Sequence, residues 1–485
     1  MADTRRSFVK KTAVGAVAIA LSRVQKTSAL SEGLSSVSAG NDYAGIVDAG
    51  IWKSKMPINP DISNMRVVCF EDNKMLTKTP SNGSKFSSVN EVIDGEKVAE
   101  NMDRMAMALA EKSSADTAWK TIFRSSKSWE ETKAAIKING VPSNYVRVAV
   151  VKKVIDVLVG FGVKPENIVI YDAAYDASAV YGEYADTKDP TKLRAVVANR
   201  SDKMGGKQSV KVPVIDMDCY VPKYLADGTT DILVNIAVNK GHLSDVGTTT
   251  LCLKSHYGTF VNNSDTAFYF HPGLGGPNKS SDLMMGAVVA TNKTEAIIGG
   301  NPVRQQLCIV DSILAMKSGP QGGPDVLSHK LVMGTFAGAV DYCTVKKIRE
   351  EEMNQKHNET MVKRFLTDFG YAETDPEWIK LDPTGSISER LNPGSEQSTI
   401  LFEMSGSSLK TSSVKFSIPK NHKAAVQTTV LDLKGNVVAR MTSSGSNVVR
   451  WDGKTMNGKT VKAGAYVVEM QAGSFRATER LSIIR

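Results

Sequence analysis

Residues 134–172 read AAIKINGVPSNYVRVAVVKKVIDVLVGFGVKPENIVIYD, and this stretch decides the fold class. Ala134–Ile138 is a short apolar run that predicts a strand. Apolar residues then recur at helical spacing over residues 151–158, and Gly160 and Gly162 are expected to end that helix. Asn167–Tyr171 is a second apolar run. Strand, helix and strand in so short a stretch form a βαβ unit, and the two strands of such a unit are parallel.

The surrounding sequence extends this unit into a larger α/β domain. We expect Ser143 or Asn144 to cap the helix of the unit. Further strands are expected at Asp231–Val238 and Leu307–Val310, and further helices at Gly95–Lys112 and from Ala339 to about Lys356. The sequence therefore predicts a parallel-sheet α/β domain over residues 40–392.

Polar side chains directly follow the predicted strands. They are Lys137, Asn139, Asp172, Lys240, His242 and Asp311. Ligands of open parallel sheets bind at the carboxyl ends of the strands, so these groups are expected to share one edge. Lys137 and Lys240 would hold an anion, His242 would act as the acid or base, and Asp311 would orient a group or bind a metal. The plain alternative is that strand ends meet water and carry polar residues for that reason.

A second group of candidates lies close by in the sequence. Lys254 and His256 lie fourteen residues beyond Lys240 and His242, and we take them as ligand-binding candidates beside Lys137 and Asn139. Alternatively, Thr248–Leu253 is a helix with a hydroxyl face and His256 is its solvated end. A third metal ligand, if one exists, would come from Asp245, Asp311 or His271, and the sequence leaves the metal and any cofactor unknown.

Two features farther along favour structural roles as much as functional ones. The glycine- and proline-rich loop at Ser318–Pro324 offers backbone N–H groups to an anion, but it is equally a surface turn. Asp341 follows an apolar run at Lys330–Phe336 and is expected to cap or open the next helix.

The N-terminus predicts export. Arg5 and Arg6 precede the apolar run Thr12–Leu21, and small residues follow near Ser28. The pattern resembles a twin-arginine signal peptide over residues 1–30 and implies the twin-arginine export machinery as a partner; a general secretory signal with a chance arginine pair is the alternative. The apolar run is shorter than the ~20 residues that span a bilayer, so we expect no transmembrane segment in the mature protein. The expected location is the periplasm, the cell surface or the medium.

Charge and cysteine usage narrow the function classes. The net charge of +9 comprises +5 in residues 1–29 and +7 in residues 396–485, which leaves the centre at −3. We therefore expect no nucleic-acid binding, because that function usually places a basic patch on the binding domain. The five cysteines are scattered without a Cys-x-x-Cys motif, so neither an iron–sulfur cluster nor a disulfide framework is expected.

The composition changes after Asn392, and residues 396–485 predict a β-sandwich. Short alternating runs are expected as strands at Val414–Ile418, Gln427–Leu433, Val437–Met441, Val448–Trp451, Ala465–Met470 and Ser474–Ile484. Glycine turns separate them, and Asn457-Gly458 is a strong hairpin signal.

Several motifs of the α/β part occur in a familiar order. They are Lys137-Ile138-Asn139, Asn235–His242, Thr250–Gly258, Ile309-Val310-Asp311 and Ala339-Val340-Asp341. Together, over roughly residues 60–360, they resemble the bacterial and archaeal domain-of-unknown-function family 362. This chain departs from the family pattern after Lys254 and before Ala339. The resemblance implies no particular reaction.

The C-terminal part resembles two related modules. The string from Leu431-Asp432-Leu433-Lys434-Gly435 through Trp451-Asp452-Gly453 to Ala463-Gly464-Ala465-Tyr466 is similar to the immunoglobulin-like domain of flagellar hook-capping proteins and to the sorting domain of type IX secretion cargo. The second resemblance implies the type IX machinery as a partner, and a passive stalk or a carbohydrate-binding β domain is the alternative. Taken together, the sequence predicts an exported protein, either an enzyme for a small anionic substrate or a non-catalytic ligand-binding or cell-surface protein.

Overall fold

The computed structural model describes residues 55–80, 89–141, 144–198, 206–212, 217–242, 249–261 and 281–383, and in the C-terminal part 401–405, 413–417, 425–432, 435–443, 448–462, 464–472 and 475–483. The chain divides into two units, Met1–Leu391 and Asn392–Arg485. The predicted signal peptide, Ser143, Asp245 and His271 lie outside the described residues. In the part that the structure describes, no helix is both long and apolar enough to cross a membrane.

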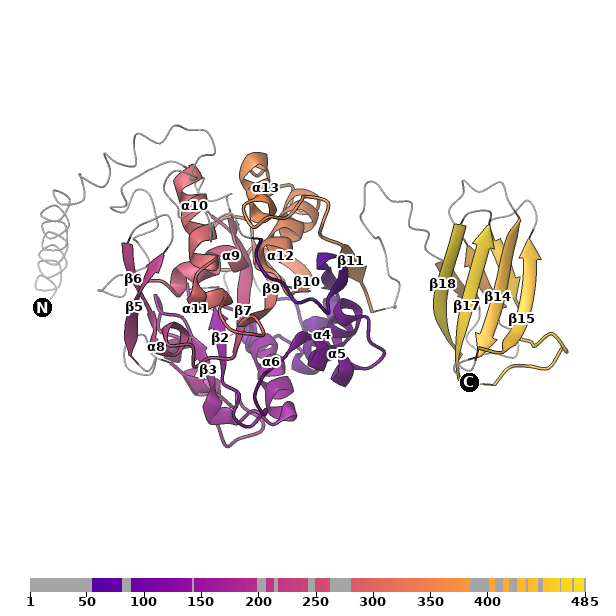
Figure 1. The fold of residues 1–485 in the computed structure, drawn as a ribbon, viewed down its shortest axis with the longest axis horizontal. Coiled ribbons are helices and arrows are strands. Elements are labelled where there is room, and N and C mark those ends of the chain that lie inside the picture. Colours follow the sequence, from indigo (N-terminus) through magenta and orange to yellow (C-terminus); the bar gives the residue numbers. More distant parts are fainter. Residues whose placement is uncertain are drawn as a thin grey trace, which may run out of the picture. The chain divides into compact units, whose positions relative to one another are not determined.

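The first unit is built on one mixed, largely parallel sheet (Figure 1). Its strand order is β11-β1-β10-β9-β7-β2-β3-β4, with β8 paired to β7. The strands are β1 Val67–Glu71, β2 Ala134–Ile138, β3 Ile168–Tyr171, β4 Val196–Val197, β7 Ile232–Gly241, β8 Thr249–Thr250, β9 Gln305–Met316, β10 Val326–Gly334 and β11 Trp378–Leu381. The run from β9 to β4 is parallel throughout, and β10 is antiparallel to both of its neighbours.

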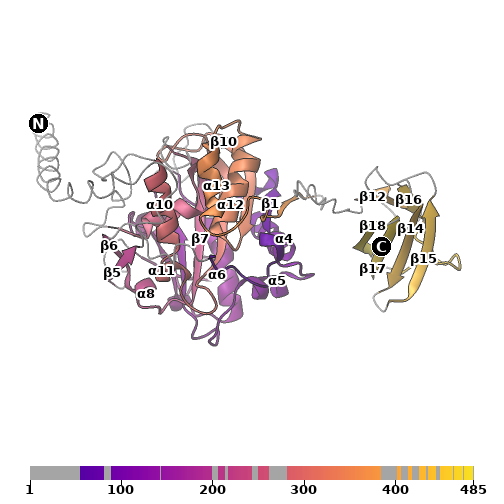
Figure 2. The same cartoon turned by 45° about the horizontal axis from the view of Figure 1, so that its top comes forward.

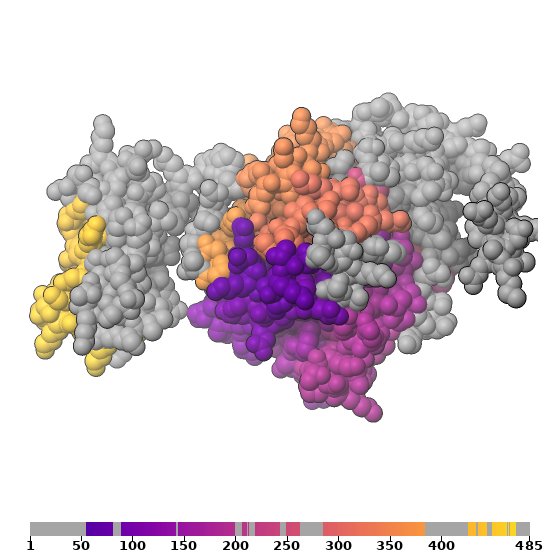
Figure 3. Space-filling model, turned by 180° about the vertical axis from the view of Figure 1, so that it is seen from behind, coloured from indigo at the N-terminus to yellow at the C-terminus, as the bar shows by residue number. Residues whose placement is uncertain are grey.

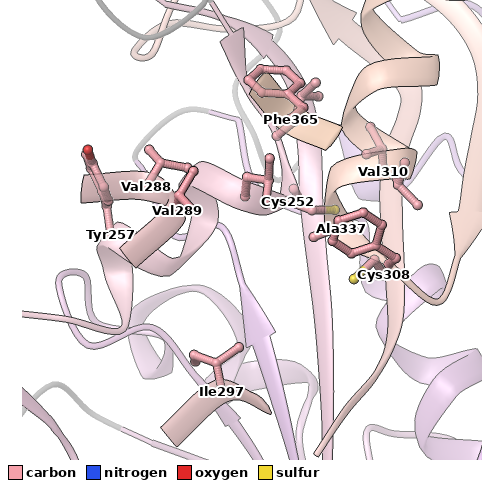
Figure 4. Close-up of a cluster of buried hydrophobic side chains, with 14 of the residues drawn as sticks. Cys252, Tyr257, Val288, Val289, Ile297, Cys308, Val310, Ala337 and Phe365 are labelled. Atoms are coloured by element: carbon pink, nitrogen blue, oxygen red, sulfur yellow. The ribbon is translucent and has the colours of Figure 1, made fainter. Parts of the chain in front are cut away.

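Helices cover both faces of this sheet, as Figure 2 shows from a second angle. One face packs on α4 Gly95–Ala110, α5 Ala115–Ile122 and α6 Val148–Phe161. The other packs on α9 Cys252–Ser255, α10 Ser281–Asn292, α11 Glu295–Ile298, α12 Ala337–Cys343 and α13 Glu359–Thr367. Figure 4 shows part of this second core, in which Cys252, Cys308, Val310 and Phe365 come from helices and a strand far apart in the chain.

The remaining elements are short. An antiparallel pair consists of β5 Lys207–Val212 and β6 Met217–Pro222. The others are α7 Ser178–Tyr181, α8 Lys223–Ala226, the 3-10 turns η2 Ser63–Met65, η3 Asn73–Met75, η4 Pro165–Asn167, η5 Gly182–Tyr184 and η6 His256–Gly258, and the π-helix η8 Thr344–Glu350, which continues α12. Seen from behind, the indigo surface of the α4–α5 region lies above the magenta surface of the residues that follow α6 (Figure 3).

The predicted βαβ unit is β2, α6 and β3, whose strands pair in parallel. Gly160 does not end α6 as predicted but lies inside it, and Gly162 ends the helix in the left-handed conformation at φ 110°, where a side chain would be strained. The expected cap is wrong, because the residue at the start of α6 is Arg147. Asn144 lies before the helix, where its side chain accepts a hydrogen bond from the Arg147 guanidinium.

The chain reverses direction across the sheet between β2 and β7. From β2 it proceeds to β3 and β4 on one side, whereas β7 and β9 lie on the other. The connection after β2 passes over the α6 face, and the connection after β7 passes over the α9–α11 face. Such a switch point is the place where ligands of doubly wound sheets usually bind.

The second unit contains two antiparallel sheets that share one core. One sheet is β12 Leu401–Ser405, β13 Ser413–Ser417 and β16 Val448–Trp451, and the other is β15 Val437–Ser443, β14 Val426–Asp432, β17 Gly464–Ala472 and β18 Phe475–Ile483. Trp451 packs on Tyr466 of the other sheet with ring centroids 6.2 Å apart. β12 lies before the first strand that the sequence predicts in this unit. Gly458 adopts φ 74° in the predicted Asn457-Gly458 turn.

Candidate functional site

The first pair of the candidate site joins the ends of β2 and β3. The Lys137 ammonium lies 3.1 Å from Asp172 Oδ2 and donates to the Ile138 carbonyl at 2.6 Å and to Ser255 Oγ at 3.3 Å. Lys137 is fully buried and Asp172 is 3 % exposed. Burial lowers the pKa of Lys137, while the Asp172 carboxylate acts in the opposite direction. The two residues form a buried ion pair.

Backbone groups complete this pair and leave little space around it. Asp172 accepts N–H groups from Gly140 at 2.9 Å, Ala174 at 2.9 Å and Tyr175 at 3.1 Å. Gly258 lies against the pair, since a Cβ placed there would stand 2.6 Å from Asp172 Oδ1 and 2.9 Å from Lys137 Nζ. Only glycine fits at that position without displacing its neighbours.

Lys240 lies near the end of β7 and has no carboxylate within ion-pair distance among the described residues. Its ammonium donates to Asn139 Oδ1 at 2.7 Å and to the Asn144 carbonyl at 3.1 Å. The side chain is fully buried. Burial lowers its pKa to about 7, and the positive charges of Arg147 and Lys137 contribute in the same direction. Lys240 is therefore partly neutral at physiological pH.

Asp311 is not at a strand end, which corrects our prediction. β9 continues to Met316, so Asp311 lies inside the strand and is fully buried. Its Oδ2 accepts the backbone N–H of Arg147 at 2.7 Å and lies 3.4 Å from Arg147 Nε. Burial raises the pKa of Asp311, and the Arg147 charge opposes that rise. Asp311 thus holds the first turn of α6 to the sheet.

The two histidines of the prediction differ in their surroundings. His256 is fully buried, with Nε2 2.7 Å from Gln305 Oε1 and Nδ1 3.0 Å from Thr259 Oγ1. Burial lowers its pKa to about 3, so His256 is neutral at physiological pH and is not a solvated helix end. His242 directly follows β7 and is half-buried. Of the two, His242 is the more exposed to solvent.

Lys254 and Asp341 lie on the α9 side of the sheet. Lys254 is 7 % exposed, and its ammonium stands 5.7 Å from the centre of the Tyr257 ring. Asp341 lies within α12 and not at its start; its carboxylate accepts the N–H groups of Cys252 at 2.9 Å and Leu253 at 2.7 Å. It therefore caps α9 instead of its own helix. Burial raises the pKa of Asp341 to about 8, although these two backbone hydrogen bonds act against the rise.

The glycine-rich loop packs on the end of β7. The Gly241 N–H donates to the Ser318 carbonyl at 3.1 Å, and a Cβ on Gly319 would stand 2.3 Å from the Gly241 oxygen. All five cysteines are buried free thiols. Among the described residues, no group of three or more His, Cys, Asp and Glu side chains is arranged to hold a metal ion.

The structure brings most of the predicted residues together but closes them off from solvent. Lys137, Asn139, Asp172, Lys240 and Asp311 lie around the ends of β2, β3 and β7 and inside β9, all less than 5 % exposed. The alternative that these strand ends meet water is wrong for these five residues, because they are buried against one another, against Arg147 and against nearby backbone. Arg147, Ser255 and Gly258 also contact these residues but are not among the predicted site residues. The one signal for Gly258 was its place in the Thr250–Gly258 motif.

Comparison with known proteins gives information on the C-terminal unit. Residues 404–474 match the family of FlgD Ig-like domains. A solved structure described as PorZ, an essential bacterial surface component of the type IX secretion system of Porphyromonas gingivalis, is 15 % identical over 22 % of this chain and 16 % of its own, with a TM-score of 0.15. So low a score carries no argument about this chain. No curated protein matches it. The similarity that is shown is therefore to an Ig-like domain at the C-terminus.

Proposed function

We propose that the α/β unit binds a small anionic ligand where β2 and β7 end, and that Lys240 exchanges a proton with it. The observation that carries this proposal is a surplus of hydrogen-bond donors. A charged Lys240 ammonium has three N–H groups but two acceptors among the described residues. Asn144 Nδ2 is buried and also lacks an acceptor there. An anion beside these donors would supply the acceptors that they need.

The charges around Lys240 support the same ligand class. Lys137 is matched by Asp172 and Arg147 by Asp311, so the charge of Lys240 is left without a carboxylate partner among the described residues. A buried unpaired cation is costly, and a bound anion would offset that cost. The position supports it as well, because Lys240 and Asn139 lie at the switch point between β2 and β7.

A second candidate function, a non-catalytic surface protein, has one observation in its favour. The start of a helix after a parallel strand is a usual anion position. At the start of α6 the Asp311 carboxylate already accepts the Arg147 N–H group. The chain thus supplies its own anion at that helix end, which suits a fold that no longer binds a ligand there.

Delivery to the cell exterior is the other half of the proposal. The twin-arginine pattern at Arg5-Arg6 would direct export across the inner membrane. The FlgD Ig-like match supports a β-sandwich attachment module at the C-terminus. We propose that this module serves sorting by type IX secretion or attachment at the cell surface, and that the α/β unit is related to domain-of-unknown-function family 362.

Thermal unfolding of the full-length protein with phosphate, sulfate, acetate and glyoxylate tests the anion site. We expect at least one anion to raise the melting temperature saturably, Lys240→Met to abolish the shift, and Lys240→Arg to retain it. Lys164→Met is the matched control, because Lys164 is exposed and lies before β3, away from the carboxyl ends of the strands. An equal shift in wild type and Lys240→Met would refute the anion site, and no shift with any anion would favour the non-catalytic protein.

A further inference from the structure

We infer that Lys240 is the nucleophile of an imine-forming site, and that its ligand is a small carboxylic acid that carries a ketone or an aldehyde. This inference rests on the proposed anion site and adds to it the class of substrate and the group that reacts. The contacts of the amine carry it, together with Asn144 Nδ2, a buried donor that lacks an acceptor among the described residues.

Without a bound anion, the two acceptors around Lys240 match a neutral amine, whereas the ammonium of the proposed anion site needs the anion as its third acceptor. A neutral –NH₂ group has two N–H donors and one lone pair in a tetrahedral arrangement, whereas –NH₃⁺ has three donors. Asn139 Oδ1 and the Asn144 carbonyl accept two hydrogen bonds from Nζ, at 2.7 and 3.1 Å. With both N–H groups held in this way, the lone pair is left in the remaining direction, which is what attack on a carbonyl carbon requires.

The surroundings of the amine support its neutral form. Lys240 is fully buried, and the positive charges of Arg147 and Lys137 repel its ammonium, so the charged form is disfavoured. Desolvation and a neighbouring cation are the two general ways in which a lysine amine is activated as a nucleophile. The described carboxylates near it, Asp172 and Asp311, are each held by another cation.

Asn144 supplies the second group that such a site needs. Its Oδ1 accepts from Arg147 Nη1 at 2.9 Å, which fixes the amide and leaves Nδ2 as a buried donor without an acceptor among the described residues. Its own carbonyl contacts Lys240 Nζ, so the donor belongs to the same small region. A carbonyl oxygen that gains negative charge during attack would be stabilised by such a donor.

The step balances without an oxidant or a reductant. The neutral Lys240 amine adds to the carbonyl carbon, a C–N bond forms, and the carbonyl oxygen takes a proton to give a carbinolamine. The carbinolamine then takes back the proton that the Lys240 ammonium gave up on becoming neutral, its C–O bond breaks with loss of water, and a protonated imine forms between Nζ and the ligand carbon. Overall, an ammonium and a carbonyl give an iminium and one water.

Reductive trapping in the full-length protein tests the inference. The protein is incubated at pH 7 with glyoxylate and cyanoborohydride, and its lysines are mapped by peptide mass spectrometry. An amine with a pKa of about 7 has a neutral fraction about a thousandfold above that of an ordinary lysine at this pH. Allowing for restricted access to a buried group, we expect Lys240 to carry at least tenfold more adduct than the exposed control Lys164.

Two variants distinguish the imine-forming lysine from the anion site on which it depends. Lys240→Arg is expected to keep the glyoxylate-dependent thermal shift and to lose the adduct, and Asn144→Ala to slow adduct formation at Lys240 while Lys164 is labelled as before. Adduct on Lys164 but not on Lys240, with the thermal shift intact, would overturn the imine and leave the anion site standing. Absence of both the adduct and the shift would overturn the anion site itself.

Discussion

Replacement of Gly258 by alanine is the most direct test of how the ends of β2 and β3 are packed. The added Cβ would stand 2.6 Å from Asp172 Oδ1, 2.9 Å from Asp172 Oδ2 and 2.9 Å from Lys137 Nζ. All three contacts are shorter than van der Waals contact, and their partners cannot retreat freely. Asp172 is held by three backbone N–H groups and Lys137 by three oxygens.

The expected cost follows from what overpacking costs elsewhere. An extra methyl group in a close-packed interior destabilises by about 1–3 kcal/mol, and here it also disturbs a buried ion pair, so we expect a value toward the upper end of that range. Urea unfolding followed by helical ellipticity measures it, because the helices in the described residues all belong to the first unit. The native backbone at Gly258 has no positive φ, so strain from the conformation itself is not a confounding contribution.

Gly160→Ala is the matched control. Gly160 lies inside α6, and nothing stands within 4 Å of a Cβ placed there. Alanine in a helix interior is favoured over glycine by about 1 kcal/mol, so this variant is expected to be slightly more stable than wild type. The reasoning about Gly258 would be refuted if both variants changed stability in the same direction, or if Gly258→Ala unfolded at the wild-type urea concentration.

Three further predictions follow from the charged groups and the leader. Because the pKa of Lys240 falls to about 7 on folding, the unfolded state binds more protons than the folded state between about pH 7 and pH 10.4. The free energy of unfolding should therefore rise with pH in that range, by at most ~1.4 kcal/mol per pH unit. Lys240→Met should flatten that part of a urea-unfolding pH profile, and an unchanged slope would contradict the assignment. Asp311→Ala should destabilise the first unit by about 3–5 kcal/mol, because it leaves the buried Arg147 charge without its carboxylate. Asp311→Leu combined with Arg147→Met removes both charges and should recover part of that loss. A double variant that is less stable than Asp311→Ala would argue against the ion pair. Changing Arg5 and Arg6 together to lysine should retain the protein in the cytosol of a twin-arginine-competent bacterium, and unaltered export on cell fractionation would favour a general secretory signal.

The pattern of apolar residues predicted much of the architecture because it reports on local geometry. The spacing over residues 134–172 predicted β2, α6 and β3 in parallel order, and the structure confirms that arrangement. Where local reasoning failed, a side chain had found a partner that the periodicity of the sequence does not report. Asn144 does not cap α6, since Arg147 takes its side chain. Asp311 does not end β9, because a buried carboxylate is tolerated inside a strand when Arg147 lies beside it.

By itself, then, the sequence determined the order of strands and helices in the βαβ unit, the polar character of the strand ends, and the Ig-like strands after Asn392. The tertiary structure alone decided that those strand ends are closed, that Lys240 meets Asn139 and Asn144, and that Gly258 lies over Lys137 and Asp172. The physical reason is the distance along the chain between the partners. A periodic pattern reports which face a residue takes, whereas the depth of burial and the hydrogen-bond partner of Lys240 depend on residues about a hundred positions away.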